Sequence, residues 1–308
     1  MPLPGRGSCL DKPPGEWQIS TMSAEKLNRL RELLLSCQSC LVAYSGGVDS
    51  VFLAYVAKTV LGPKSLAVIA DSPSLPRREL AEALEIARRF EIPVQVVRTN
   101  EFDNPAYLAN PSNRCYFCKH ELFTELEPVA RNGGFAVIAY GENASDVGDH
   151  RPGAKAAGEF AVRAPLREAG LTKAEIRKLS AEFGLPTADK PQMACLSSRI
   201  PYGESVTPEK LRMIEEAEAV LRDLGIHDVR VRHHELKLGP LARIEIGLGE
   251  MGTLFQGDAF LKVAEALVKV GYAHVTLDLL GYRRGSLNEP VASSIALARG
   301  RKLSVPAG

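Results

Sequence analysis

The sequence predicts an α/β protein in which a Rossmann-like parallel sheet, covered by helices on both faces, precedes a smaller C-terminal α+β domain. Three observations lead to this fold class. Short apolar runs alternate with stretches of helical spacing over roughly the first two thirds of the 308 residues, and a glycine-rich turn follows the first apolar run. The alternation then changes after Pro201-Tyr-Gly203. Repeated strand–helix units pair their strands in parallel and need helices on both faces of the sheet.

The elements of the predicted parallel sheet follow from local spacing. Leu27, Leu30 and Leu34 recur on one face of a first helix over residues 23–36. The helix after the glycine-rich turn ends at Gly62-Pro63, and a capping box at Thr172 opens the last helix. Apolar runs predict strands at 40–44, 66–70, 94–98 and 135–140, and helical spacing predicts helices at 78–90, 117–131 and 173–183.

The region after residue 203 shows a different order of elements. A helix opens at Thr207-Pro208 and is followed by two strands, a second helix and a final strand. The first 22 residues are rich in Pro and Gly and predict a disordered leader. We therefore expect a leader at 1–22, a sheet domain at 23–202, a small α+β domain at 203–290 and a tail at 291–308.

Charge and composition exclude several classes of protein. Lys and Arg number 38 against 37 Asp and Glu, whereas proteins that hold long stretches of nucleic acid usually carry a clear basic excess. No apolar run approaches the roughly 20 residues of a membrane span, and the N-terminus lacks the apolar centre of a signal peptide. We expect a cytoplasmic protein with a small-molecule partner, no nucleic-acid partner and no membrane, whose six cysteines are not in disulfides.

The segment Ser45-Gly-Gly-Val-Asp-Ser50 is typical of a phosphate-binding turn. It lies between a strand and a helix, so the backbone N–H groups of Gly46 and Gly47 can approach an anion at the helix N-terminus. Ser45 and Ser50 add hydroxyl donors. Asp49 would repel a phosphate unless a cation intervenes, which indicates Mg²⁺. The segment matches neither a Walker loop nor a dinucleotide fingerprint.

Two further polar segments follow predicted strands. Asp71-Ser72 follows the second strand, and Gly141-Glu142 follows the fourth. Ligands in open parallel sheets lie beyond the carboxyl ends of the strands. The sequence therefore predicts that these residues lie at the same edge of the sheet as the glycine loop, with ordinary turn chemistry as the alternative.

The cysteines allow several kinds of chemistry. Cys115 and Cys118 form a C-x₂-C pair, and Cys195 is a distant third. Such a set can hold an iron–sulfur cluster, form a redox dithiol or bind zinc, and the spacing alone does not decide. Cys195 is also a candidate nucleophile, because Lys190 and Arg199 flank it and favour the thiolate. Burial or chance is favoured for Cys37 and Cys40, and no role is expected for Cys9.

Five stretches together resemble one known family. The glycine loop itself resembles that of the PP-loop ATP pyrophosphatases, which predicts adenylylation as the first step. The stretches are the glycine loop, Arg114-Cys-Tyr-Phe-Cys-Lys119, Gly148-Asp-His-Arg-Pro-Gly153, Cys195-Leu-Ser-Ser-Arg-Ile-Pro-Tyr-Gly203 and Gly281-Tyr-Arg-Arg-Gly-Ser-Leu-Asn-Glu289. On these stretches the chain, from Cys40 to Glu289, resembles the LarE family, ATP-dependent sulfur transferases that build the nickel-pincer nucleotide cofactor of lactate racemase.

The resemblance implies a reaction and its cofactors. Members adenylylate a carboxylate of pyridinium-3,5-biscarboxylic acid mononucleotide with ATP and Mg²⁺ and then insert sulfur to give a thiocarboxylate. Some members sacrifice the sulfur of the cysteine matching Cys195. Others hold a 4Fe-4S cluster with three cysteines, and Cys115, Cys118 and Cys195 place this chain with them. Ser72 would then lie near the adenosine, and Gly141 and Glu142 near the α-phosphate.

The resemblance also implies cationic sites and an assembly. Lys190 and Arg199 are expected to stabilise charge during the reaction. The substrate is an anionic nucleotide, and the candidates for its phosphate are Arg232, Arg243 and Arg283. A homo-oligomer is expected, with a hexamer implied by the family.

Two other functions fit parts of the pattern. Several PP-loop enzymes with a C-x₂-C pair and a third cysteine thiolate tRNA, but the balanced charge and the lack of a basic, aromatic-rich extension weigh against this function. A protein that binds adenine nucleotides without catalysis is the other alternative. Formation of AMP in the presence of the pyridinium substrate separates these functions.

Overall fold

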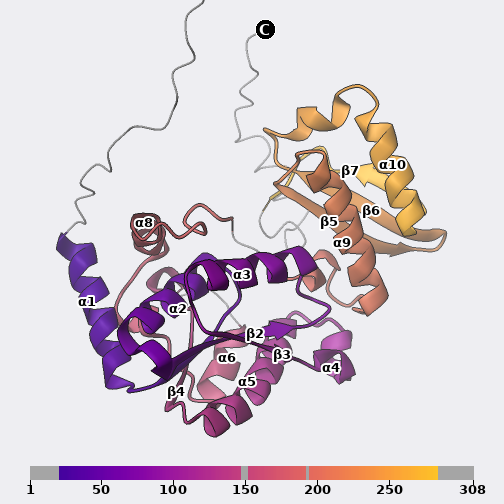
Figure 1. Ribbon diagram of the computed structural model, residues 1–308. Helices are drawn as coiled ribbons and strands as arrows, with labels where there is room; N and C mark the ends of the chain where they lie inside the picture. The colour runs from indigo at the N-terminus through magenta and orange to yellow at the C-terminus, as the bar shows by residue number, and fades with distance from the viewer. Residues whose placement is uncertain (1–20, 147–151, 192–193, 284–308) are drawn as a thin grey trace, which may run out of the picture.

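A four-stranded parallel sheet forms the centre of the first part of the chain. The computed structural model describes residues 21–146, 152–191 and 194–283 (Figure 1). The strands lie in the order β3-β2-β1-β4, and every neighbouring pair is parallel. Their bounds are β1 (Cys40–Ala43), β2 (Ser65–Asp71), β3 (Val94–Arg98) and β4 (Val137–Tyr140).

Helices cover both faces of this sheet, as the alternation of strands and helices predicts. Val42 and Ala67 point into a core shared with α1 and α2, whereas Leu41 and Val68 point into a core shared with α5. Figure 1 shows α2 and α3 on one side of the sheet and α5 and α6 on the other. The helices are α1 (Thr21–Ser36), α2 (Val48–Leu61), α3 (Arg77–Arg89), α4 (Pro105–Leu108), α5 (Arg114–Gly133), α6 (Pro152–Glu159), α7 (Pro165–Glu168) and α8 (Lys173–Glu182).

Local sequence signals explain where these helices begin and end. Thr172 and Glu175 form the predicted capping box of α8. Pro105, Pro152 and Pro165 each stand at the first position of a short helix that sequence spacing missed, because four to eight residues are too few to show a period. Helix α5 begins three residues before the predicted start, so its first turns carry Cys115 and Cys118.

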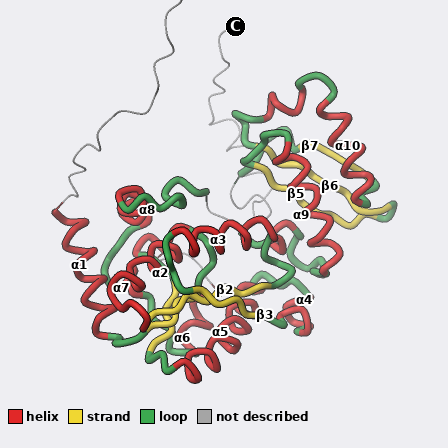
Figure 2. Tube along the Cα trace, viewed as in Figure 1, coloured by secondary structure: helices red, strands yellow, loops and turns green. Residues whose placement is uncertain are grey.

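A second, three-stranded sheet follows. Strands β5 (Val229–Leu236) and β6 (Gly239–Ile246) form an antiparallel hairpin, and β7 (His274–Leu277) pairs with β6 in parallel. Helices α9 (Pro208–Asp223) and α10 (Ala259–Val270) cover one face over a core that includes Val229, Val231 and Ile244 (Figure 2). The predicted fold class is therefore confirmed, while the boundary at residues 202 and 203 stays a prediction.

A buried ion pair links the segment that follows Cys195 to helix α9. Arg199, just before the predicted boundary, donates from Nε to Glu218 of α9 at 2.8 Å, and both side chains are fully buried. Within the described ranges, no helix combines the length and the apolar character that crossing a bilayer requires. Residues 1–20 of the predicted leader, the predicted tail and the stretch 148–151 lie outside the described residues, whereas Thr21 and Met22, also assigned to the leader, begin α1.

Candidate active site

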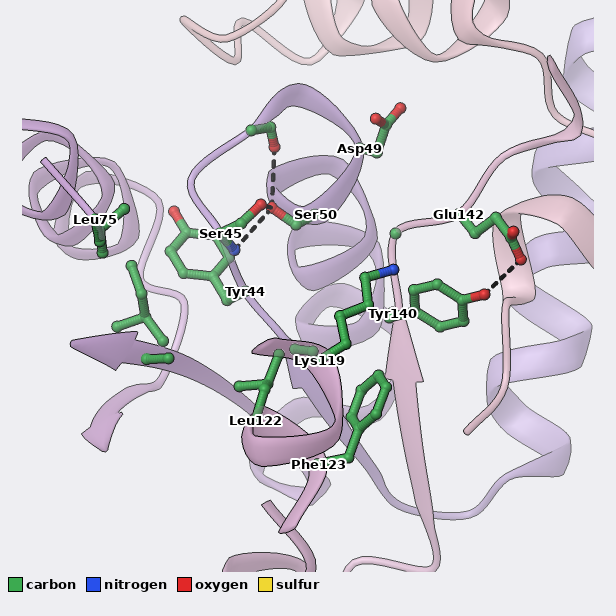
Figure 3. A pocket seen from close by; sticks show the side chains of 15 residues that line it. Tyr44, Ser45, Asp49, Ser50, Leu75, Lys119, Leu122, Phe123, Tyr140 and Glu142 are labelled. Carbon is green, nitrogen blue, oxygen red and sulfur yellow. Dashed lines mark hydrogen bonds between the residues drawn. The ribbon is translucent and has the colours of Figure 1, made fainter. Parts of the chain in front are cut away.

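The glycine loop joins β1 to α2 and is built around Ser50. The Ser50 hydroxyl accepts from the backbone N–H of Ser45 at 3.1 Å and lies 3.0 Å from the Ser45 hydroxyl (Figure 3). Gly46 has φ +70°, and a Cβ there would come within 2.6 Å of the Ala83 side chain, so only glycine fits. No side chain caps the N-terminus of α2 at Gly47. Its first N–H groups therefore point toward the loop as an anion-binding cradle.

Asp49, the predicted Mg²⁺ ligand, has a lysine partner. Its carboxylate pairs with the Lys173 ammonium and accepts a hydrogen bond from the Asn143 amide at 3.4 Å. Burial raises the pKa of Asp49 above its ordinary value, and the nearby Lys173 opposes that shift. Sequence reasoning missed Lys173, although its place directly after the capping residue Thr172 fixes it at the loop edge. The lysine neutralises Asp49 beside the expected phosphates.

The end of β4 approaches the glycine loop closely. A Cβ on Gly141 would lie 2.9 Å from the backbone nitrogen of Ser50, so the glycine permits this contact. Next to it, the buried Glu142 carboxylate accepts from Tyr140 and, at 2.7 Å, from Arg167. Both predicted residues of this segment thus lie at the predicted edge, and the charge of Glu142 is compensated.

A first cavity, of about 270 Å³, lies between the glycine loop, the end of β4 and α5 (Figure 3). Its wall is largely apolar and includes Leu122 and Phe123. The charged side chains in the wall are Lys119, Asp49 and Glu142, and the Lys119 ammonium lies 4.7 Å from the centre of the Tyr140 ring. The lysine directly follows Cys118 in one of the five recognised stretches, which is the signal that could have drawn attention to it. The cavity therefore combines apolar side chains with the ammonium of Lys119 next to the glycine loop.

A second cavity, of about 320 Å³, connects the glycine loop to the cysteines. Its lining includes Ser45, Gly47 and Asp49 on one side and Cys118 and Cys195 on another. Ser72, predicted near the adenosine, also lines it. The structure therefore brings together, in one cavity, residues that lie up to 150 positions apart in the sequence.

The three cysteines lie within electrostatic reach of one another. Burial and the charge of Cys195 raise the pKa of Cys115 and of Cys118. Arg114 and Lys119 act in the opposite direction on Cys115. In the part of the chain that the structure describes, however, no three His, Cys, Asp or Glu side chains are arranged to hold a metal ion. The three thiols therefore lie near one another but are not arranged as the ligands of a metal ion.

The two cations predicted to assist Cys195 are both engaged. Lys190 lines the second cavity and pairs with Glu79 at 2.7 Å and with Glu82. Arg199 is fully buried and, besides pairing with Glu218, donates to the Cys195 carbonyl at 3.1 Å. Arg199 thus holds the backbone of the Cys195 segment, and its charge is balanced by a carboxylate.

The predicted phosphate-binding arginines lie near the second sheet, each close to a carboxylate. Arg232 pairs with Glu245 and donates to the Ser198 carbonyl at 3.0 Å, which brings it close to the Cys195 segment. Arg243 pairs with Glu245 and Asp278, and Arg283 lies 3.9 Å from Asp278. Arg243 lines a separate open cavity of about 540 Å³ instead of the one that contains Cys195.

Cys37 and Cys40 are buried, as predicted, with exposed fractions of 5% and 0%. Arg163 donates to the Cys37 sulfur at 3.1 Å. Burial raises the pKa of Cys40 to about 12, which keeps its thiol protonated. Cys40 begins β1 and Cys37 lies in the turn before it, at the opposite end of that strand from the glycine loop.

Similar proteins carry the family assignment. The chain is 44% identical over 267 residues to the uncharacterized protein slr1717 of Synechocystis, covering 87% of this chain and 98% of that protein. It is 32% identical over 277 residues to the pyridinium-3,5-bisthiocarboxylic acid mononucleotide synthase of Lactiplantibacillus plantarum, covering 90% and 97%. A GMP synthase of Clostridium tetani is 25% identical over 237 residues, covering 68% of this chain and 44% of the synthase. No protein-family model matches the sequence.

The two named synthases are similar to different lengths of this chain. The L. plantarum synthase aligns over nearly its whole length, so the sequence similarity spans the parts of this chain that form both sheets. The GMP synthase shares a part that fits the PP-loop fold seen in the first sheet. The glycine loop at the carboxyl edge of β1 and the full-length similarity lead to one conclusion: the chain belongs to the LarE-type family of pyridinium-3,5-bisthiocarboxylic acid mononucleotide synthases.

Proposed function

We propose that this protein is an ATP-dependent sulfur transferase that acts on pyridinium-3,5-biscarboxylic acid mononucleotide and forms AMP and pyrophosphate. The observation that carries the proposal is the cavity of about 320 Å³ that the glycine loop shares with Cys118 and Cys195. A phosphate-binding loop and thiols in one cavity fit a reaction in which an activated acyl group meets a sulfur nucleophile. The similarity to the L. plantarum pyridinium-3,5-bisthiocarboxylic acid mononucleotide synthase indicates the substrate class.

The reaction divides into two displacements. A substrate carboxylate oxygen attacks the α-phosphorus of ATP, and pyrophosphate leaves. A sulfur nucleophile then attacks the acyl carbon, AMP leaves, and the carbon–sulfur bond of a thiocarboxylate forms. The product would serve the nickel-pincer cofactor of lactate racemase.

The loop residues have distinct roles in the first displacement. Ser45, Gly46, Gly47 and Ser50 would hold the β- and γ-phosphates with the free N–H groups of α2. Mg²⁺, bound by Asp49, would supply charge neutralisation for the leaving pyrophosphate. On either side of the loop, Ser72 would lie near the adenosine and Gly141 and Glu142 near the α-phosphate.

Lys190 and Arg199 would assist the second displacement in different ways. Lys190 lines the cavity and would stabilise charge that develops on the departing AMP. Arg199 is fully buried, so it would act by fixing the Cys195 backbone through its bond to the carbonyl. For the substrate phosphate, Arg232 is the best placed candidate because it contacts Ser198, and Arg243 and Arg283 are farther candidates.

Cys115, Cys118 and Cys195 are the proposed source of sulfur. Cys195 raises the pKa of both Cys115 and Cys118, and three thiols this close have the right donor chemistry for an iron–sulfur cluster. They would have to reorient to hold one, because their present arrangement is not a metal site. A 4Fe-4S cluster would supply a sulfide bound at its open iron. The alternative source is the Cys195 sulfur itself, whose loss would leave dehydroalanine.

Self-association is proposed for the second sheet. Exposed apolar side chains gather on and before α10, including Phe255 and Leu261 with exposed fractions of 59% and 53%. The proposed homo-oligomer, a hexamer by family resemblance, would bury this surface. Mass measured by light scattering during gel filtration tests it, and a monomer at every concentration would contradict it.

The test of the function is acceptor-dependent formation of AMP. Anaerobically purified protein is incubated with MgATP and the pyridinium biscarboxylate, and AMP, pyrophosphate and thiocarboxylate are measured by mass spectrometry. Iron, sulfide and intact protein mass before and after turnover decide the sulfur source. Absence of AMP formation would overturn the proposed function. Absence of iron after anaerobic reconstitution, together with loss of the mass of H₂S from Cys195, would overturn the cluster.

A further inference from the structure

Glu101 is a buried carboxylate that the reaction described above does not use. It lies in the 3₁₀ turn Glu101–Asp103 that follows β3, and only 2% of it is exposed. Its Oε1 atom accepts a hydrogen bond from the Ser74 hydroxyl at 3.3 Å. Its Oε2 atom is buried and has no hydrogen-bond partner among the described residues. Burying a carboxylate oxygen without a donor is unfavourable, so the fold maintains this group at a cost to stability.

Glu101, the residue that carries the unpartnered oxygen, lines the second cavity. The glycine loop, Ser72, Ser74 and Cys118 line the same cavity. The hydroxyls of Ser72 and Ser74 lie 2.7 Å apart, and Ser74 donates onward to Glu101. This chain of polar atoms follows the carboxyl ends of β2 and β3, next to the strand that carries the loop. A nucleotide with its phosphates on the loop would extend along this wall.

Two structural explanations for Glu101 do not account for the free oxygen. A buried carboxylate with a purely structural role would have both oxygens bonded, as Glu218 does with Arg199 and Arg222. A base that activated the neighbouring thiol would favour the thiolate. Instead, the charge of Glu101 adds to the burial that raises the pKa of Cys118. What remains is a ligand that brings a hydrogen-bond donor into the cavity.

We propose that Glu101 is a specificity-determining residue whose Oε2 atom accepts a hydrogen bond from a ribose hydroxyl of the nucleotide in this cavity. A carboxylate near the end of a neighbouring strand is a general solution for ribose hydroxyls in parallel α/β sheets. Ser74, itself hydrogen-bonded to Ser72, donates to the other oxygen, so the carboxylate is oriented before the ligand arrives. The inference rests on the proposed function only in requiring a nucleotide on the glycine loop.

Two nucleotides in the proposed reaction carry ribose, and the experiment separates them. Dissociation constants for ATP, 2′-deoxy-ATP and 3′-deoxy-ATP are measured by calorimetry on the full-length wild type and on Glu101→Gln. The KM and kcat for the pyridinium nucleotide are measured on the same proteins. Glu85→Gln is the matched control, since Glu85 is exposed on α3 and pairs only with Arg88 among the described residues.

The wild type is expected to bind one deoxy analogue about 10- to 100-fold more weakly than ATP, the range of a hydrogen bond to a charged group. Glu101→Gln should lose most of that discrimination, and Glu85→Gln should keep it. If the hydroxyl belongs to the acceptor, Glu101→Gln instead raises the KM for the pyridinium nucleotide and leaves kcat and ATP discrimination unchanged. Either result supports the proposal and identifies the nucleotide.

The proposal is overturned if Glu101→Gln changes neither the ATP discrimination nor the acceptor KM. Thermal unfolding checks that the variant folds, and removal of an unpaired buried charge should leave its melting temperature equal or higher. Binding by calorimetry does not depend on sulfur transfer. A protein that forms no AMP with the acceptor, yet discriminates ATP through Glu101, would contradict the proposed function and support this inference.

Discussion

Glu218→Gln is expected to be one of the most destabilising single-atom changes in this protein. The Glu218 carboxylate is fully buried and accepts from Arg199 at 2.8 and 3.1 Å, from Arg222 at 2.8 Å and from the Val231 backbone at 3.1 Å. An amide in its place removes the only negative charge that directly pairs with Arg199 within the described chain. It also turns one acceptor into a donor that faces guanidinium groups.

The expected size of the effect follows from the burial. Removing one partner of a buried ion pair costs about 3–5 kcal/mol, because the other charge stays buried and unpaired. At roughly 2–4 °C per kcal/mol for a chain of this size class, the melting temperature should fall by about 6–20 °C. The matched control is Glu216→Gln on the same helix. Glu216 forms an exposed pair with Arg212, which is worth only about 0.3–0.5 kcal/mol.

Differential scanning calorimetry and its pH dependence provide the assay. Burial acts to raise the pKa of Glu218, but the charges of Arg199 and Arg222 hold it below its ordinary value. Its contribution is therefore present above the unfolded-state value of about 4.3 and is lost as the pH falls through the lowered folded-state pKa. The difference between wild type and Glu218→Gln should shrink in acid. Equal shifts for Glu218→Gln and Glu216→Gln would refute the reasoning.

Two further variants test the glycine loop and its edge. Gly141→Ala places a Cβ 2.9 Å from the Ser50 nitrogen, so it should weaken ATP binding and cost about 1–3 kcal/mol of stability. The control Gly158→Ala, which has open space around the added Cβ, should change neither property. Calorimetric titration measures ATP binding, and thermal unfolding measures stability. Asp49→Asn should abolish acceptor-dependent AMP formation yet leave the melting temperature equal or higher at pH 8, because burial raises the pKa of Asp49 and the charged form is disfavoured in the fold. A marked drop in that melting temperature would show that the pair with Lys173 stabilises the protein.

The fold could be predicted because its signals are local. Each signal lies within a few neighbouring residues. Examples are the capping box at Thr172 and Glu175, the uncapped glycine turn before α2 and the runs of apolar residues. Their consequences, a helix start or a strand, depend little on distant residues. The short helices opened by Pro105, Pro152 and Pro165 were missed because they are too brief to show a period.

Several residues that line the candidate site could be predicted from the sequence, but the residues that pair with them could not. The loop, Ser72, Cys118, Lys190 and Cys195 do line one cavity. The sequence did not reveal that Lys190 pairs with Glu79 or that Arg199 is buried against Glu218, since those carboxylates lie elsewhere in the chain. Pairing over such separations depends on the packing of α3 and α9, which no local pattern encodes. Lys190 and Arg199 lie near Cys195 in the sequence, but both already pair with carboxylates in the fold.

The most direct test of sulfur transfer by this protein is a single-turnover reaction of anaerobically prepared protein with MgATP and pyridinium-3,5-biscarboxylic acid mononucleotide. AMP, pyrophosphate and a thiocarboxylate are expected in equal amounts. The sulfur is expected to come from the site that Cys115, Cys118 and Cys195 share. Nucleotide binding without AMP formation, or AMP formation that yields no carbon–sulfur bond, would contradict the proposed sulfur transfer.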